Sequence, residues 1–265
     1  MPEQSNIKPT IAVHKFSSCD GCQLAFINLG ESLISLAQQV DILHFAEAGP
    51  VNTDATVDIA FIEGSVSTKE DLSRLKNIRE NSRYVITIGA CATSGGIQAL
   101  RNMQNTNEWI AEIYASPSLI ESLDKSTPIK DHIKVDIELW GCPISQQQLL
   151  SAIRSLLLGV LPKEENDKVC MECKRQQTVC VMVTKKQACM GPVTRTGCGA
   201  LCPHAGRDCY GCYGPSENIN GHALANRFQG FGLLSDEIAR RFLFINSNAE
   251  SFKQEGLHWK NESKT

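Results

Sequence analysis

The pair Cys19-Asp20-Gly21-Cys22 comes directly after an apolar, β-branched run at residues 11–16, and this order constrains the fold more than any other feature. A C-x₂-C pair brings two thiolates to one soft metal ion or cluster, but it is only half of a site. Cys91 and Cys142 stand in the same position after two later apolar runs. We therefore expect the fold to bring these four cysteines together.

Apolar runs alternate with stretches of helical period in the first part of the chain. The expected strands cover residues 11–16, 40–45, 57–62, 84–88 and 133–140, and the expected helices cover 23–39, 68–81 and 145–158. This alternation favours an α/β fold whose parallel sheet is covered on both faces. In such sheets, binding sites form beyond the carboxyl ends of the strands. The four cysteines should meet at that edge, where four thiolates are enough for one 4Fe–4S cluster.

Glu63 follows the third expected strand and should face the same edge. Its carboxylate could set the environment of a cluster or pass protons. It could equally cap the helix that follows, together with Ser65, Ser67 or Thr68. The sequence leaves both roles open.

Net charge and targeting signals bound the functional classes. The chain has 265 residues, a net charge of −3 and 12 cysteines, so no nucleic-acid partner is implied. We recognise no signal peptide, twin-arginine leader or membrane span, and we expect a cytoplasmic protein with a polar leader at residues 1–9. In a reducing compartment cysteines more often bind metal than form disulfides, and twelve makes three sets of four.

The composition changes abruptly at a charged run, residues 163–168, which we interpret as the boundary between domains at 10–162 and 163–215. The second domain is rich in glycine and has few large apolar residues, so we expect it to need metal to fold. Eight cysteines there suit two 4Fe–4S clusters, as in two-cluster ferredoxins. They are Cys170, Cys173, Cys180, Cys189, Cys198, Cys202, Cys209 and Cys212.

The sequence allows two partitions of these eight ligands. One groups Cys170, Cys173 and Cys180 with Cys202, because the cysteine before a proline ligates the other cluster in ferredoxins. The other partition gives Cys212 to that group instead. His204 could replace a cysteine, but a surface histidine in a loop is the favoured interpretation.

Residues 216–265 are expected to form a helical segment and a tail. Helices are predicted at 216–228 and 235–244, the second with Ser235 as its N-cap, and the residues from Glu255 onward are predicted to be a tail. An apolar stripe that includes Leu233, Ile238 and Phe242 favours packing against the body of the protein. Packing on another subunit is the alternative.

Taken in order, these motifs resemble the small subunits of nickel–iron hydrogenases. The matching stretches are 13–23, 62–65, 89–96 and 141–143, and the stretches 197–203 and 209–215 are similar to the cytoplasmic group. That group includes the delta subunit of NADP-linked sulfhydrogenases and the viologen- and F420-linked enzymes. One departure is Gln23, because many hydrogenase small subunits carry a glutamate after the C-x₂-C pair.

The resemblance implies a flavodoxin-like first domain, whose four cysteines hold the proximal cluster, and a ferredoxin-like domain with the medial and distal clusters. These three 4Fe–4S clusters would carry electrons between the nickel–iron site of a separate large subunit and a diaphorase-type flavin or iron–sulfur subunit. The reaction would be H₂ oxidation or proton reduction, with no nickel ligand and no catalytic residue in this chain. NADP(H) is the expected acceptor, and F420, a viologen or heterodisulfide reductase partner and polysulfide are alternatives.

Three rival functions remain at this point. A zinc-binding structural module would use the pairs Cys170/Cys173 and Cys209/Cys212 as in zinc ribbons. The related cluster subunit of quinone-reducing complexes carries two adjacent cysteines, and this sequence has no Cys-Cys pair. A free ferredoxin-like carrier would be redox-active alone, whereas a hydrogenase subunit should co-purify with a nickel-bearing chain.

Overall fold

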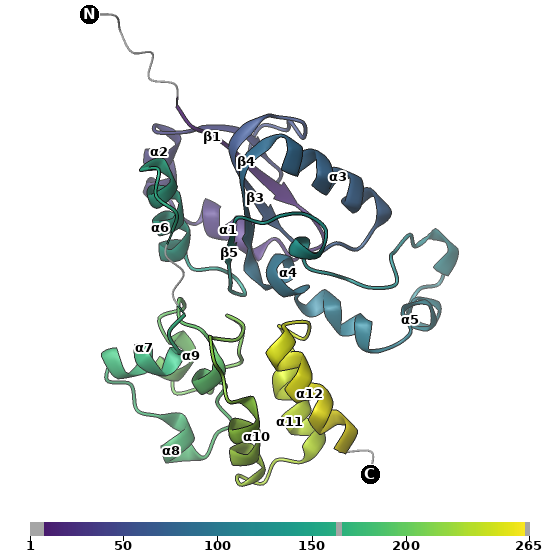
Figure 1. Cartoon of the computed structure of the whole chain (residues 1–265), viewed down its shortest axis with the longest axis vertical. Coiled ribbons are helices and arrows are strands. Elements are labelled where there is room, and N and C mark those ends of the chain that lie inside the picture. The colour runs from purple at the N-terminus through teal and green to yellow at the C-terminus, as the bar shows by residue number, and fades with distance from the viewer. Residues whose placement is uncertain (1–7, 163–165, 263–265) are drawn as a thin grey trace, which may run out of the picture.

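The computed structural model describes residues 8–162 and 166–262 and divides the chain into two lobes, one built on a sheet and one helical (Figure 1). Residues 1–7 of the expected leader and residues 163–165, the first half of the expected boundary at 163–168, lie outside the described residues. No described helix is long and apolar enough to cross a membrane.

The first lobe contains a five-stranded parallel sheet in the order β2-β1-β3-β4-β5. This is the flavodoxin-like order, so the predicted α/β class is confirmed. The strands are β1 (Thr10–Lys15), β2 (Asp41–Phe45), β3 (Val57–Glu63), β4 (Ser82–Ile88) and β5 (Ile137–Leu139). Only β5 is much shorter than predicted. The Asp136 carboxylate accepts from the N–H of Val85 at 2.8 Å and takes the place of a strand carbonyl there.

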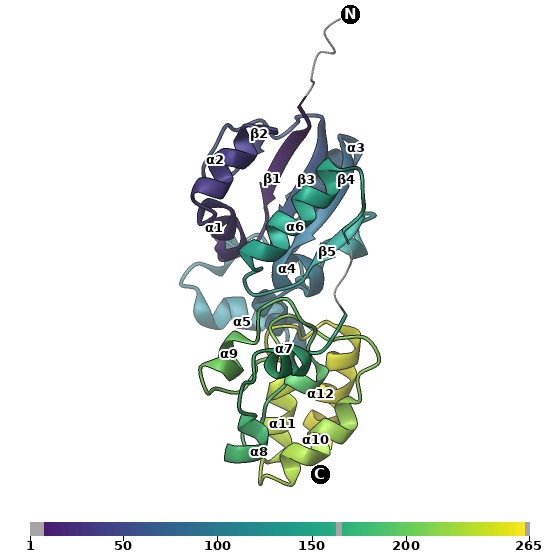
Figure 2. The same ribbon diagram turned by 90° about the vertical axis from the view of Figure 1, so that its left-hand side faces the viewer.

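Helices cover both faces of the sheet, as predicted (Figure 2). One face packs against α1 (Gly21–Ile27), α2 (Glu31–Ala37) and α6 (Gln146–Leu157), and the other against α3 (Lys69–Glu80). The helix predicted at 23–39 is in fact two, because the chain turns at Gly30, where φ is +56°. Capping boxes at Thr68 and Ser145 start α3 and α6 where the sequence predicted.

Short helices and turns make up the remaining described elements of both lobes. They are α4 (Gly89–Ser94), α5 (Thr106–Ile113), α7 (Val169–Arg175), α8 (Val181–Lys185), α9 (Leu201–His204), and four 3₁₀ turns at Ile97–Met103, Pro117–Leu119, Ile129–Asp131 and Gly191–Val193.

The second lobe has one apolar core, shared by the cysteine-rich segment and three C-terminal helices. These are α10 (Gly221–Gln229), α11 (Ser235–Phe242) and α12 (Glu250–Glu262). The prediction of a tail from Glu255 is wrong, because Phe252 and Trp259 bury one face of α12. The helix predicted at 216–228 begins only at Gly221, and the N-cap of α11 is Leu234 rather than Ser235.

Asn246 joins the two lobes. Its side chain is 1% exposed, accepts a hydrogen bond from Ser94 Oγ at 2.7 Å and donates one to the carbonyl of Gly211 at 2.8 Å. Trp140 adds an apolar contact, since a Cβ at Gly214 would lie 2.3 Å from its ring. The lobes are therefore packed against each other at the edge where the strands end.

Candidate iron–sulfur cluster sites

Four cysteines gather at the carboxyl edge of the sheet, as predicted. Cys19 follows β1, Cys22 lies in α1, Cys91 lies in α4 and Cys142 follows β5. Burial, and after it neighbouring charges that include thiols of this set, raise the pKa of Cys22, Cys91 and Cys142, and that of Cys91 reaches about 12. We call these four residues the sheet-edge group.

Two glycines allow the backbone to approach this group. Gly89 has φ +84°, and a Cβ there would lie 2.3 Å from Cys22 Sγ. Gly96 has φ +59°, and a Cβ there would lie 2.6 Å from Cys91 Sγ. A side chain at either position would combine backbone strain with a collision against a candidate ligand. The site is therefore built for close contact between backbone and sulfur.

Glu63 lies at the end of β3, is 2% exposed, and faces this edge as expected. Its carboxylate accepts from the N–H groups of Cys22 at 2.9 Å and Gln23 at 3.3 Å. It thus caps α1, whose own N-cap Asp20 makes no side-chain cap bond, and not the following helix, which Thr68 caps. Burial raises the pKa of Glu63, and these N–H donors oppose that shift.

The amino terminus of α1 is capped by this carboxylate. A helix amino terminus beside a thiolate cluster can present its first N–H groups to the sulfur atoms, but here those of Cys22 and Gln23 bind Glu63. Gln23 is fully buried and lies next to Glu63, where it opposes the rise in the pKa of that carboxyl group. Among the described residues, neither the oxygen nor the nitrogen of the Gln23 side-chain amide has a hydrogen bond of ordinary geometry.

The eight remaining cysteines form two groups in the second lobe. Burial raises the pKa of Cys170, Cys173 and Cys189, and Cys180 is among the thiols whose charge raises the pKa of each of these three further. We call these four the far group. Both partitions considered from the sequence separate Cys189 from the other three, whereas in the structure Cys189 lies beside Cys170.

Cys198, Cys202, Cys209 and Cys212 make up the second set, which we call the near group. Burial, and after it the charges of neighbouring thiols that include Cys198 and Cys202, raise the pKa of Cys212 to about 12. Cys209 lies between the groups, because both Cys189 and Cys212 add to the effect of burial on its pKa. His204 is exposed, in agreement with a surface role.

Short contacts link one group to the next. Cys142, in the sheet-edge group, lies close enough to Cys212, in the near group, for its charge to be among the causes that raise the pKa of the Cys212 thiol. The N–H of Cys209 donates to Cys189 Sγ in the far group at 3.3 Å. Tyr213 is 4% exposed and donates from its hydroxyl to the carbonyl of Pro143 at 3.3 Å. The three groups therefore form one continuous series.

The donor set fits iron–sulfur clusters. All twelve cysteines are free of disulfides. Backbone N–H groups point at sulfur, as Gly211 does toward Cys209 Sγ at 3.4 Å. Thiols whose pKa is raised by burial become thiolates when bound metal supplies positive charge. Within residues 8–162 and 166–262 no three His, Cys, Asp or Glu side chains lie close enough to hold a single metal ion.

Two residues of the site were not predicted from the sequence. Glu172 lies inside the pair Cys170/Cys173 and binds the loop that carries Cys198. Tyr213 lies between the lobes. The only sequence signals for these roles are the position of Glu172 between two cysteines and the position of Tyr213 next to Cys212.

Comparisons with known proteins agree with this geometry. The model of the family described as "NADH ubiquinone oxidoreductase, 20 Kd subunit" matches residues 19–156. Sulfhydrogenase 2 subunit delta of Pyrococcus furiosus is 32% identical over 231 residues, covering 87% of this chain and 96% of that protein. A subunit of the vhu F420-non-reducing hydrogenase of Methanocaldococcus jannaschii is 30% identical, covering 89% of this chain and 93% of that protein.

A solved structure gives the same result. An NAD⁺-reducing NiFe hydrogenase in its H₂-reduced state has a chain that is 28% identical, with a TM-score of 0.56, covering 59% of this chain and 95% of that chain. The fold, the family model and the near full-length relatives all agree. This chain belongs to the nickel–iron hydrogenase small subunits, within the wider family of the 20 kDa subunit of NADH:ubiquinone oxidoreductase.

Proposed function

We propose that this chain is the electron relay of a cytoplasmic nickel–iron hydrogenase and holds three 4Fe–4S clusters through its twelve cysteines. The observation that carries the proposal is the continuous series of sulfur groups. It begins at Cys19 and ends at Cys180, the two cysteines that are exposed. Each cluster, when bound, accepts and donates one electron with little rearrangement.

The proposed ligands follow the three groups. The sheet-edge group would hold the proximal cluster, the near group the medial cluster and the far group the distal cluster. The protein tunes such centres through charge, hydrogen bonds to sulfur and burial. Here Cys142 would act on the medial cluster through its closeness to Cys212, and the Glu63 carboxylate would add negative charge beside the proximal cluster.

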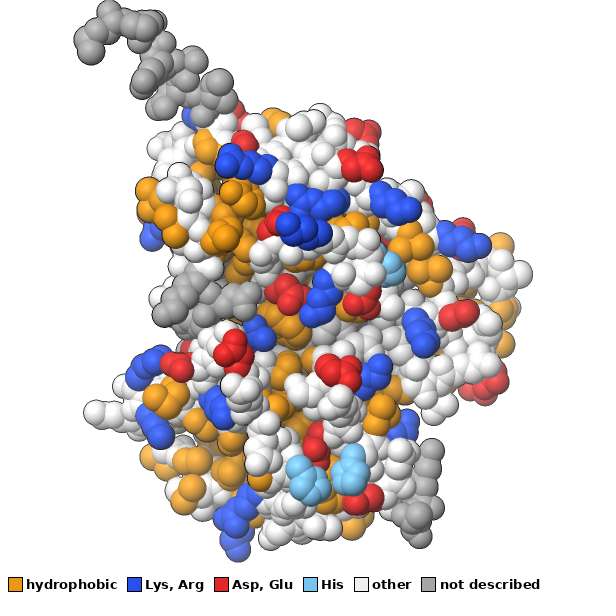
Figure 3. All heavy atoms as spheres, viewed as in Figure 1, with side chains coloured by type: hydrophobic (Ala, Val, Ile, Leu, Met, Phe, Trp, Pro, Cys, Tyr) orange, Lys and Arg blue, Asp and Glu red, His pale blue; other side chains and the backbone are white. Residues whose placement is uncertain are grey.

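We propose that electrons enter or leave at the far group. Cys180 is exposed there, beside the exposed side chains of Val179 (68%) and Val183 (76%). Lysines and arginines on and next to α7 and α8 surround this apolar surface, and Figure 3 shows both kinds of side chain in that part of the second lobe. An acceptor subunit with an apolar, acid-rimmed surface would fit it.

The acceptor subunit is proposed to be a diaphorase-type flavin or iron–sulfur protein linked to NADP(H). Support comes from the relation to a sulfhydrogenase delta subunit and to a chain of an NAD⁺-reducing hydrogenase. The relation to an F420-non-reducing hydrogenase keeps other acceptors as alternatives. The nickel–iron large subunit is the second proposed partner, and twelve free cysteines suit a reducing cytoplasm.

The test uses the native complex and two variants. The complex should contain a nickel-bearing chain and about twelve iron atoms for this polypeptide. Cys19→Ala should abolish H₂-dependent reduction of every acceptor. Cys212→Ala should retain hydrogen–deuterium exchange at the nickel site better than reduction of the final acceptor. Equal loss of both activities in Cys212→Ala, or a colourless zinc-loaded protein, would overturn the proposal.

A further inference from the structure

Glu172 connects two of the three cysteine groups. It lies in α7 between Cys170 and Cys173 of the far group. Its carboxylate, however, reaches the loop that carries Cys198 of the near group. Oε1 accepts from the N–H groups of Gly197 at 2.9 Å and Gly199 at 3.1 Å, and Oε2 accepts from Ala200 at 3.0 Å.

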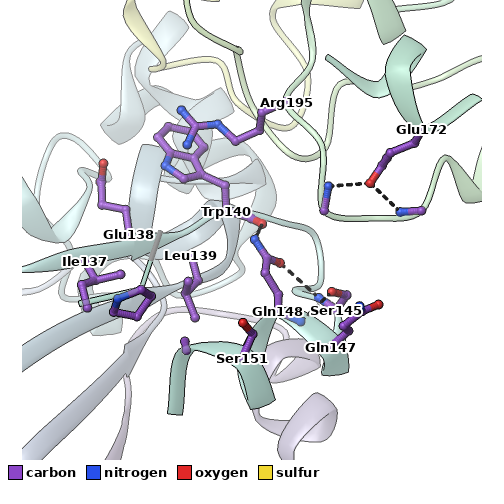
Figure 4. A pocket seen from close by; sticks show the side chains of 14 residues that line it. Ile137, Glu138, Leu139, Trp140, Ser145, Gln147, Gln148, Ser151, Glu172 and Arg195 are labelled. Atoms are coloured by element: carbon purple, nitrogen blue, oxygen red, sulfur yellow. Dashed lines mark hydrogen bonds between the residues drawn. The ribbon is translucent and has the colours of Figure 1, made fainter. Parts of the chain in front are cut away.

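Successive N–H groups of this loop converge on the carboxylate, as Figure 4 shows for two of them. The loop reaches this shape through positive φ angles of +127° at Gly197, +66° at Gly199 and +51° at Ala200. Ala200 is fully buried and would be strained without compensation. Such a concave row of N–H groups binds an anion, and here the protein supplies the anion itself.

The loop holds a candidate ligand in its middle. The Cys198 thiol lies 3.8 Å from Glu172 Oε2. Glu172 is also the neighbour of Cys173 in α7 and lies two residues from Cys170. One negative charge therefore acts on ligands of both groups.

The Glu172 side chain also lines a cleft beside the loop. A cleft of about 230 Å³ separates the loop from β5 and α6, and Trp140, Gln148 and Glu172 line it (Figure 4). Among the described residues that line this cleft, none is a cysteine. The carboxylate thus faces three N–H donors on one side and a protein-lined space on the other.

We propose that Glu172 is a positioning residue shared by the two C-terminal clusters, which holds the Cys198 loop in its strained shape and lowers the reduction potentials of both clusters. This inference depends on the proposed three-cluster relay. The function of such a residue is to keep the reduction potentials of two consecutive clusters matched, because its one negative charge shifts both potentials in the same direction.

The experiment compares the complex carrying Glu172→Gln with the unmutated complex and with Glu112→Gln, an exposed change on α5. Iron content and EPR-monitored redox titration are measured, together with amide hydrogen exchange of residues 197–200. In Glu172→Gln both C-terminal potentials should rise, the proximal potential should stay unchanged, and the loop should exchange faster. Glu112→Gln should change none of these.

Unchanged potentials in an iron-loaded Glu172→Gln complex, or a rise in only one of them, would overturn the shared role. If Glu172→Gln fails to retain iron, Glu172→Asp decides, since it keeps the charge on a shorter side chain. If the Glu172→Asp complex recovers its iron, this supports the need for a carboxylate at this position. If Glu172→Asp loses as much iron as Glu172→Gln, that need is refuted. Iron content and EPR of the unmutated complex test the relay itself, so failure of one proposal is distinguishable from failure of the other.

Discussion

Replacing Gly89 with alanine tests whether the backbone at the sheet edge is shaped around a ligand. The residue has φ +84°, and the new methyl carbon would lie 2.3 Å from Cys22 Sγ. The left-handed conformation costs about 1–2 kcal/mol for alanine, and overpacking against a sulfur that cannot retreat adds roughly 1–3 kcal/mol. We therefore expect a loss of roughly 2–5 kcal/mol in stability, concentrated at Cys22.

Gly159 offers a matched control in the same lobe. It has φ +71°, and a Cβ there would meet nothing within 4 Å. Gly159→Ala should therefore show the backbone cost alone, about 1–2 kcal/mol, and leave the clusters intact. The difference between the two variants isolates the collision with Cys22.

The assay is iron content, EPR of the proximal cluster and the thermal unfolding temperature, measured on the whole complex. Gly89→Ala should lose about four of about twelve iron atoms, and Gly159→Ala none. If both variants keep the same iron, the same EPR signal and the same unfolding temperature, the sulfur of Cys22 is not fixed by a ligand role and the reasoning is wrong.

Two further predictions concern buried polar groups. Burial, and then His44 stacked 4.6 Å away, lowers the pKa of His14 from 6.5 to about 3, so only the unfolded chain binds this proton between those values. The neutral, buried His14 therefore contributes stability that is fully present above pH 6.5 and is lost on acidification. The free energy of unfolding should fall by about 2 kcal/mol at pH 5 for this reason. His14→Phe should therefore reduce the drop in unfolding temperature between pH 7 and pH 5, and an unchanged drop would contradict this. Asn246→Ala leaves the buried Gly211 carbonyl without its partner and should destabilise the complex by about 1–3 kcal/mol, measured as a lower unfolding temperature. The control variant Asn226→Ala, at an exposed position on α10, should not lower the unfolding temperature. Equal decreases in the two variants would exclude the role of Asn246 between the lobes.

The sheet and its edge could be predicted because their signals are local. Each β-branched run precedes a turn with glycine or cysteine, and parallel strands bring those turns together whatever the loops between them do. The break at Gly30 was also visible as a glycine inside a helical pattern. By contrast, α12 was missed because its apolar face rests on few residues, chiefly Phe252 and Trp259, within a polar sequence.

The grouping of the second-lobe cysteines could not be derived from spacing. Cys189 joins the far group because the chain from α8 returns to the turn at Gly191–Val193, close to Cys170. The role of Glu172 depends on contacts with residues about 25 positions away in the sequence. Such contacts depend on how loops fold over one another, and a pattern of cysteines alone does not contain that information.

The closeness of Cys142, in the sheet-edge group, to Cys212, in the near group, has a consequence for how the clusters titrate. Charge on a ligand of one centre acts on a ligand of the next. An electron arriving at either centre therefore changes the energy of the other, as a proton does between coupled acids. The measured potentials would then describe the pair, and separating the lobes would break the conducting contact and alter both values at once.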